Sequence, residues 1–472
     1  MKNKVSLQRH GFGWFLALLL GCCLVVGFCS LQAFGASTST KTLKKETDLT
    51  ATVGETGGFA LDSDYDETVT STGDGQYTHT EYVLKSVTSK NSSVVRVSDL
   101  TYEVLAPGSS ELVVTYTKMV YITDSENGTI SDATNPTSED VTFTVTMTTS
   151  YDMSDVTLSS SAVTIYATDY DSDADGVGTI TLQNTPYTMS DDDGITELSV
   201  FSSNDTMSVT SSLRDNVITF NCTTPGTTTL TITVNGKSFN VTLTMAKLTL
   251  VNTKLMAKGK TATLKVKMVT DSAGTTTYLD NSKITWSSSK SSVATVSSSG
   301  KIKAKKCGNT VIYACVGNVR LGCALSVATA KKVKAIKKAV KIGDTCTYSQ
   351  ARRMRANYYD CSSLVWRAYK SAGITVVSKK TAPVAATIAK WLIQTKKHKC
   401  YTFSYSDVQK MVYNAGDLGF KTGAKNGRYK GIYHVEMFIG YTYQGYADGS
   451  AVLSPRWANR DSTWYHTSII CR

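Results

Sequence analysis

The sequence has 472 residues, of which 41% are hydrophobic and 19% are charged, with 50 lysines and arginines against 38 aspartates and glutamates. This length exceeds what one hydrophobic core organises, so we expect three or four domains. The charge is uneven: residues 36–246 hold 9 basic and 29 acidic side chains, residues 247–330 hold 13 and 2, and residues 331–472 hold 25 and 7. The basic second half predicts a polyanionic partner, unless its lysines serve solubility alone.

The first 35 residues have the pattern of a secretory signal peptide. Lys2, Lys4 and Arg9 precede an apolar run, and the segment ends on Ala33-Phe34-Gly35, a small-x-small sequence suited to cleavage before Ala36. The protein is therefore predicted to be secreted to the cell wall, where anionic wall polymers are expected partners and nucleic acid is not. Two alternatives are an uncleaved membrane anchor and a lipoprotein modified at Cys22.

The cysteines are too sparse to carry the fold. Eight remain after removal of the signal peptide, at positions 222, 307, 315, 323, 346, 361, 400 and 471. Cys307, Cys315 and Cys323 are candidates for one bridge within their own domain. The spacing does not select the partners.

Three segments share one pattern, in which a turn glycine opens a run of alternating apolar and polar β-formers. The glycines are Gly108, Gly226 and Gly308, each preceded by a serine-rich stretch. Alternation of this kind is typical of half-buried antiparallel strands, and repeats of this length indicate a string of β-sandwiches. The expected boundaries are 36–150, 151–246 and 247–330.

The third repeat resembles a known family. Ile284-Thr285-Trp286-Ser287, Val293-Ala294-Thr295-Val296, Gly300-Lys301-Ile302 and Gly308 are similar to a group 2 bacterial immunoglobulin-like domain. The resemblance implies spacing or adhesion on a bacterial surface, with no chemistry. The first two repeats are divergent relatives of this pattern.

Two further segments have ambiguous signals. Asp171, Asp173 and Asp175 match the opening of a calcium loop, but Leu182 stands where a bidentate glutamate belongs, so an acidic interstrand loop is favoured. Residues 331–345 are rich in lysine and are predicted to be a basic linker, with contact to an anionic polymer as the alternative.

The residues after Asp360 change to helical periodicity. Leu364, Val365, Ala368 and Tyr369 fall on one face, and Asp360 suits the N-cap, so Cys361 is expected in the first helical turn. The positive end of a helix favours thiolate over thiol, and its free amides can stabilise an oxyanion.

A cysteine nucleophile needs a general base, and His434 is the best candidate. It opens an alternating stretch predicted to be a core strand, whereas His398 lies among lysines. The alternative is that Cys361 and His434 are ordinary structural residues.

Three blocks resemble the signatures of the NlpC-type cell-wall cysteine peptidases: Tyr359-Asp360-Cys361-Ser362-Ser363-Leu364, Gly416-Asp417-Leu418-Gly419-Phe420 and His434-Val435-Glu436-Met437-Phe438-Ile439-Gly440. The resemblance covers roughly residues 346–472 and implies a papain-like α+β fold that hydrolyses peptidoglycan stem peptides. It implies that Cys361 is the nucleophile, that His434 is the base, and that Tyr359, Asp360 and Ser362 bind the substrate's free amino group.

The sequence departs from this family at two places. Ser363 stands where many members have glycine, and the position of the third catalytic residue is taken by Tyr446. Asp448, Ser454 or Asn459 could replace it, and an inactive domain is the alternative.

The predicted protein is thus a monomeric, secreted peptidoglycan hydrolase: three all-β immunoglobulin-like sandwiches followed by an α+β papain-like cysteine peptidase domain. It should need no metal or organic cofactor. The alternatives are a cysteine amidase that cuts at the glycan–peptide junction and a surface adhesin or wall-binding protein that does not cut.

Overall fold

The computed structural model describes residues 38–73, 75–126, 129–130, 134–168, 176–377, 380–396, 398–446, 450–458 and 468–471. These residues fall into two compact units that divide after Asp152. The predicted signal peptide and the predicted calcium loop at Asp171–Asp175 lie outside the described residues. Within the described residues, no helix has both the length and the apolar character needed to cross a membrane.

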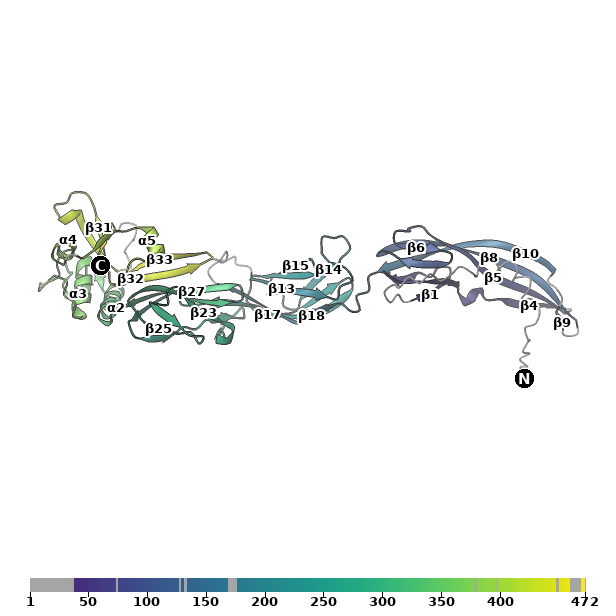
Figure 1. The fold of residues 1–472 in the computed structure, drawn as a ribbon, viewed down its shortest axis with the longest axis horizontal. Helices are drawn as coiled ribbons and strands as arrows, with labels where there is room; N and C mark the ends of the chain where they lie inside the picture. The colour runs from purple at the N-terminus through teal and green to yellow at the C-terminus, as the bar shows by residue number, and fades with distance from the viewer. Residues whose placement is uncertain are drawn as a thin grey trace. The chain divides into compact units, whose positions relative to one another are not determined.

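The first unit is a sandwich of two sheets (Figure 1). One sheet contains, in spatial order, β1 (Thr38–Leu43), β3 (Thr56–Leu61), β7 (Thr101–Val104) and β6 (Val95–Ser98). The other contains β2 (Leu49–Thr52), β10 (Thr134–Ser150), β8 (Gly108–Glu126), β5 (Gln76–Ser89) and β4 (Thr68–Gly73), with β9 (Thr129–Ile130) beside β8. Alternate residues of β8 and β10 point into one core, among them Leu112, Val114, Val145 and Met147.

The second sandwich follows the same plan. Its first sheet contains β11 (Thr157–Leu158), β13 (Gly176–Gln183), β16 (Val217–Cys222) and β15 (Val209–Arg214). Its second sheet contains β14 (Leu198–Ser202), β17 (Gly226–Val234), β18 (Lys237–Thr249), β21 (Lys267–Val269) and β22 (Thr276–Tyr278), with β12 (Ala162–Thr168) parallel to β18. Because β18 runs on to pair with β21 of the third repeat, the predicted boundary at residue 246 falls inside a strand.

The third sandwich is shorter. Its sheets are β19 (Thr253–Ala257), β27 (Val319–Ala328), β26 (Gly308–Val316) and β23 (Thr285–Ser288), and β20 (Thr261–Thr263), β25 (Lys301–Ala304) and β24 (Ala294–Val296). Short 3-10 turns occur at η1 (Ser63–Tyr65) in the first unit and η2 (Asn281–Lys283) here.

The predicted repeat is confirmed at the level of single contacts. Each of the three glycines is the first residue of a long strand, β8, β17 or β26, which pairs antiparallel with a later strand, β10, β18 or β27 respectively. Gly108 and Gly308 have φ values of 141° and 143°, a region that side chains disfavour. A Cβ at either glycine would lie 3.2 Å from a valine methyl group at the end of the serine-rich stretch.

A buried hydroxyl two residues after each glycine holds the serine-rich loop. Ser110, Thr228 and Thr310 are 2%, 3% and 1% exposed, and each accepts a backbone N–H from that loop. Thr310 Oγ1 also hydrogen-bonds the hydroxyls of Ser288 and Ser289. The serine-rich stretches are thus loops held in place by a buried hydroxyl. Sequence reasoning identified the stretches but not the hydroxyl that holds each of them.

Thr310→Val is expected to destabilise the third sandwich by about 1–3 kcal/mol, because valine fills the space but leaves the loop N–H without its buried acceptor. Denaturant unfolding of the protein measures the change. Thr263→Val is the matched control, since Thr263 lies exposed on β20. Equal effects of the two substitutions would contradict this role of Thr310.

Residues 330–471 combine helices with one sheet. The helices are α2 (Ala330–Thr345), α3 (Cys361–Ser371), α4 (Ala385–Lys390) and α5 (Tyr405–Gln409), with a π turn, η3 (Trp391–Thr395), after α4 and a 3-10 turn, η4 (Tyr429–Gly431), before the longest strand. The sheet order is β30 (Cys400–Thr402), β34 (Ile469–Cys471), β31 (Leu418–Thr422), β32 (Ile432–Gly445) and β33 (Ala451–Trp457). A separate parallel pair joins β28 (Thr347–Tyr348) to β29 (Tyr358–Tyr359).

The prediction of a basic linker over residues 331–345 is wrong, because this segment is α2. Its buried residues are Val333, Ala335, Ile336, Ala339 and Ile342, and they join the core that also contains α3. The lysines occupy the opposite face. High lysine content hid a helical apolar stripe in the sequence.

The block Gly416-Asp417-Leu418 joins three elements. Asp417 is 1% exposed and accepts the backbone N–H of Asn414 at 2.8 Å, while Lys332 of α2 lies 3.9 Å away. The Tyr369 hydroxyl of α3 donates to the Gly416 carbonyl. The block therefore fixes α2 and α3 against the start of β31.

The C-terminal domain contains a disulfide whose partners the sequence did not select. Cys400 and Cys471 face each other on β30 and β34 and form a bridge. Cys307, Cys315 and Cys323, the candidates for a bridge, are free, as is Cys361. The register of two neighbouring strands places the two bridged cysteines opposite each other. The spacing of cysteines along the sequence does not reveal this register.

Candidate active site

Cys361 is the first residue of α3, as predicted. Asp360 is the N-cap: its Oδ1 accepts the Ser363 N–H at 2.7 Å, and the Ser363 hydroxyl accepts the Asp360 N–H at 2.9 Å. This reciprocal pair satisfies two backbone donors that a helix start otherwise leaves open. Ser363, the departure from the family's glycine, thus has a capping function.

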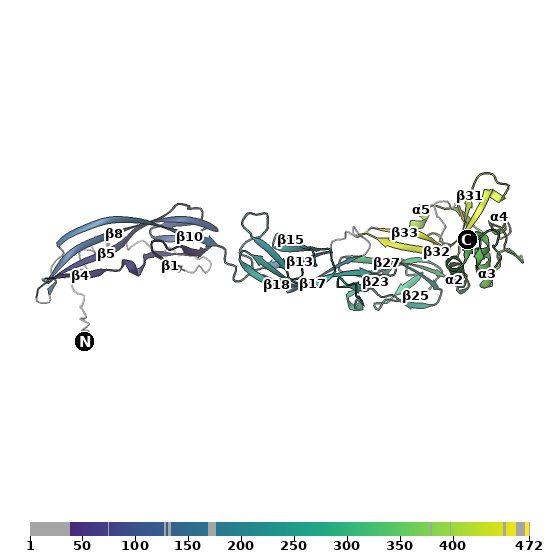
Figure 2. The same cartoon turned by 180° about the vertical axis from the view of Figure 1, so that it is seen from behind.

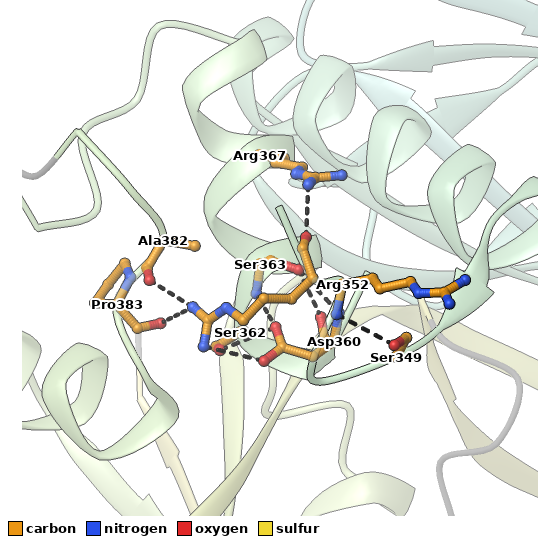
Figure 3. Close-up of polar contacts among 9 residues, drawn as sticks. Ser349, Arg352, Asp360, Ser362, Ser363, Arg367, Ala382 and Pro383 are labelled. Atoms are coloured by element: carbon orange, nitrogen blue, oxygen red, sulfur yellow. Dashed lines mark hydrogen bonds and ion pairs between the residues drawn. The ribbon is translucent and has the colours of Figure 1, made fainter. Parts of the chain in front are cut away.

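The carboxylate of Asp360 has a second partner. Arg353 Nη1 lies 3.1 Å from Asp360 Oδ2, and Arg353 Nη2 donates to the carbonyls of Ala382 and Pro383. Figure 3 shows Asp360 among the side chains of Ser362 and Ser363, with the two carbonyls to one side. A cation from the protein itself therefore already forms an ion pair with Asp360.

The three residues predicted to bind a substrate amine are all buried. Tyr359, Asp360 and Ser362 are 3%, 5% and 1% exposed, and the Ser362 hydroxyl donates to Asp360 Oδ1. Tyr359 packs edge-on against Tyr348 with 5.4 Å between ring centroids. Their predicted role in binding substrate stays a prediction.

Sequence reasoning missed Tyr348, which lies near the thiol of Cys361. Register pairs Tyr348 of β28 with Tyr359 of β29, two residues before Cys361. The Tyr348 hydroxyl and the backbone amides of Ser362 and Val435 lie close enough to the Cys361 thiol to act toward a lower pKa. A parallel bridge of two residues per strand leaves no recognisable sequence signal.

Burial nevertheless dominates the titration of the thiol. It raises the pKa of Cys361 above its ordinary value, and the negative charge of Asp360 acts in the same direction, against the Val435, Tyr348 and Ser362 hydrogen bonds. At neutral pH the resting group is a protonated thiol.

His434 lies near the start of β32, opposite Lys421 of β31. The amide of the next residue, Val435, lies close enough to Cys361 to act toward a lower thiol pKa, so this end of β32 lies near the start of α3. Nε2 of His434 lies 3.6 Å from Glu436 Oε1, while Lys421 Nζ lies 2.8 Å from the same oxygen. Burial, together with the charge of Lys421, lowers the pKa of His434 to about 4, although Asp360 acts to raise it.

The carboxylate beside the imidazole is Glu436, which sequence reasoning did not select. Residues i and i+2 of a strand share a face, so the alternation along β32 contained the signal. Ser454 pairs with Thr442, eight residues beyond His434 on β32, and is not near the imidazole. Asp448 and Asn459 lie outside the described residues.

The free energy of unfolding should fall as the pH drops from about 6.5 to about 4. Because the folded pKa of His434 is depressed, the unfolded chain binds a proton in this window and the folded chain does not. The depressed pKa of His434 contributes at most about 3 kcal/mol to the free energy of unfolding. This contribution is fully present above pH 6.5 and is lost as the pH falls toward 4. Denaturant unfolding of wild type and His434→Gln at both pH values measures it; parallel pH profiles would contradict the assignment.

Comparison with known proteins identifies one segment. The bacterial Ig-like domain (group 2) family matches residues 247–327, so the third sandwich is such a domain and its predicted resemblance is confirmed. No curated protein matches the chain.

Matches among solved structures have low sequence identity and low TM-scores. Invasin, a bacterial integrin-binding protein, has 13% identity and a TM-score of 0.24 over 55% of this chain and 59% of its own. A second match is the C-terminal 282-residue fragment of intimin, solved in complex with the intimin-binding domain of the translocated intimin receptor. It has 12% identity and a TM-score of 0.24, and the match covers 68% of this chain and 99% of the intimin chain. Domains 1–6 of the surface layer protein SbsC have 16% identity and a TM-score of 0.18, over 51% and 30%. This chain therefore spans less than two thirds of the invasin chain.

Proposed function

We propose that this protein is a cell-surface protein whose Ig-like sandwiches present a C-terminal papain-like thiol hydrolase of the NlpC type, acting on peptide stems of peptidoglycan. The observation that supports the catalytic part is the position of Cys361 as the first residue of α3, with the amide of Val435, the neighbour of His434 on β32, close enough to influence the thiol. The match of residues 247–327 to a bacterial Ig-like domain supports the surface part independently of any chemistry.

The proposed reaction begins with a neutral pair. As Cys361 Sγ attacks the amide carbonyl, its proton passes to the neutral imidazole of His434, and the carbonyl oxygen becomes negative. In this proposal the Tyr348 hydroxyl and the amides at the start of α3 stabilise that charge. His434 then gives its proton to the leaving amine as the C–N bond breaks. Water, deprotonated by His434, finally releases the acyl group from sulfur.

The second candidate is a surface-binding protein that does not cut its ligand. The bacterial Ig-like match favours this reading more directly than it favours catalysis, because such domains carry no chemistry. The burial of Cys361 and its raised pKa are also compatible with a structural cysteine.

Cys361→Ala should lower peptidoglycan hydrolysis by at least about a thousandfold, because the nucleophile is lost. Mass spectrometry of soluble muropeptides after incubation with each protein measures this loss. Cys315→Ala is the control, since Cys315 is a free cysteine that lies on β26 of the third sandwich.

Undiminished hydrolysis by Cys361→Ala would sink the mechanism. No hydrolysis by wild type together with retained wall binding would favour the binding protein. The new amino terminus in the product distinguishes a stem peptidase from an amidase acting at the glycan–peptide junction.

A further inference from the structure

A cleft of about 690 Å³ lies where the third sandwich meets the C-terminal domain, away from Cys361. One wall is formed by the loops around Lys290 and Lys306, and the other by residues 409–414. Its lining includes the exposed side chains of Lys290, Lys306 and Lys410 and no acidic residue.

The two walls are fixed relative to each other. Asn309 of β26 is 8% exposed and donates through Nδ2 to the carbonyls of Met411 and Tyr413 at 3.1 and 2.8 Å. Ser326 holds the Asn309 amide oxygen at 2.9 Å. The lysines therefore stand at the edges of a preformed concavity, where low-dielectric walls concentrate their positive potential.

We propose that this cleft binds a chain of repeating phosphodiesters on a polyol backbone, as an anionic polymer of the cell wall would present. Lysine is a compact charge suited to phosphate oxygens. The volume falls in the range of ligand pockets that hold several linked groups, and it exceeds what one phosphate fills. The inference is independent of catalysis at Cys361.

The aromatic content of the cleft argues against a nucleic acid. Single-stranded nucleic acids gain much of their affinity by stacking bases on free aromatic faces. Tyr313 is the one aromatic residue of the lining. The guanidinium of Arg320 already lies 3.8 Å from its ring centroid, and Tyr443 packs edge-on at 6.0 Å.

The test measures binding of poly(glycerol phosphate) to the full chain. The triple variant Lys290→Glu, Lys306→Glu, Lys410→Glu should lose at least about tenfold in affinity, and wild-type affinity should fall with added salt. A control triple variant changes the net charge by the same amount on exposed lysines of the third sandwich that lie outside the cleft: Lys283→Glu, Lys301→Glu, Lys303→Glu. Cys361→Ala should bind like wild type. Thermal unfolding confirms that each variant is folded.

Cys307 offers a second readout, because its thiol is exposed in the cleft lining. Bound polymer should slow alkylation of Cys307 and leave alkylation of Cys346 unchanged. Peptide mapping measures the alkylation of each cysteine. Equal loss of affinity in the two triple variants, or an unprotected Cys307, would overturn the site. Equally tight binding of a single-stranded DNA of matched charge in this cleft would overturn the assignment to a polyol phosphate.

Discussion

A chain that begins at Thr329 is expected to lose cooperative folding, whereas a chain that begins at Lys247 should keep it. The reason is a core shared between the third sandwich and the C-terminal domain. Val311 of β26 and Ala324 of β27 pack in one cluster with aromatic residues of β32, and the views of Figures 1 and 2 both place β27 beside the β32–β33 hairpin. Removing the sandwich would expose that face of β32 to water.

The size of this effect follows from burial. Tyr441 and Tyr443 are 0% and 3% exposed, and exposing a large buried side chain costs about 1.5–3 kcal/mol. The chain would also lose the hydrogen bonds from Asn309, from Tyr443 N–H to the Asn252 carbonyl, and from Arg456 to Thr253. The sum is comparable with the whole stability of a small domain, about 5–15 kcal/mol.

Calorimetry of the two truncated chains measures the difference. A substitution within the full chain checks the same contact without truncation: a Cβ at Gly322 of β27 would lie 2.5 Å from the Tyr443 ring. Gly322→Val should therefore destabilise the C-terminal domain together with the sandwich. A cooperative transition of the chain starting at Thr329, equal to that of the longer chain, would show that the shared core is dispensable.

The sequence predicted strands and repeats well, because a period of two and a turn glycine are local signals. It predicted the start of α3 for the same reason, since the Asp360 cap lies next to its helix. It did not predict α2, because the lysines of this segment outnumber the buried apolar residues of its stripe. It also gave no sign that β27 and β32, more than a hundred residues apart, form one core.

In the candidate site, too, the residues with local sequence signals were predicted and those that depend on long-range contacts were not. Cys361 and His434 were selected from local pattern, and the structure brings their elements together through the Val435 amide. Tyr348, Arg353 and Lys421 were not selected, because their contacts depend on pairing and packing rather than on spacing. Lone basic and aromatic residues are common in this basic domain, so composition could not single them out.

Lys421→Met is expected to destabilise the C-terminal domain by about 3–5 kcal/mol, because it leaves the carboxylate of Glu436 buried without a cation. Glu436 is fully buried, Lys421 is 7% exposed, and the two side chains meet at 2.8 Å. Denaturant unfolding measures the loss. Glu436→Gln leaves the ammonium of Lys421 without its partner and should also destabilise.

The double variant Lys421→Met, Glu436→Leu separates the pair's contribution to stability from its effect on His434. With both charges gone and the volume filled, stability should return to within about 1–2 kcal/mol of wild type. Lys421 helps hold the pKa of His434 near 4, so the pKa should rise in Lys421→Met, and NMR titration of the imidazole would detect this. In the double variant the loss of the Glu436 carboxylate, 3.6 Å from His434 Nε2, should offset part of that rise. An unchanged pKa in Lys421→Met would mean that burial alone keeps His434 neutral. A rise would mean that β31 supplies a charge that keeps the imidazole ready to accept a proton from Cys361.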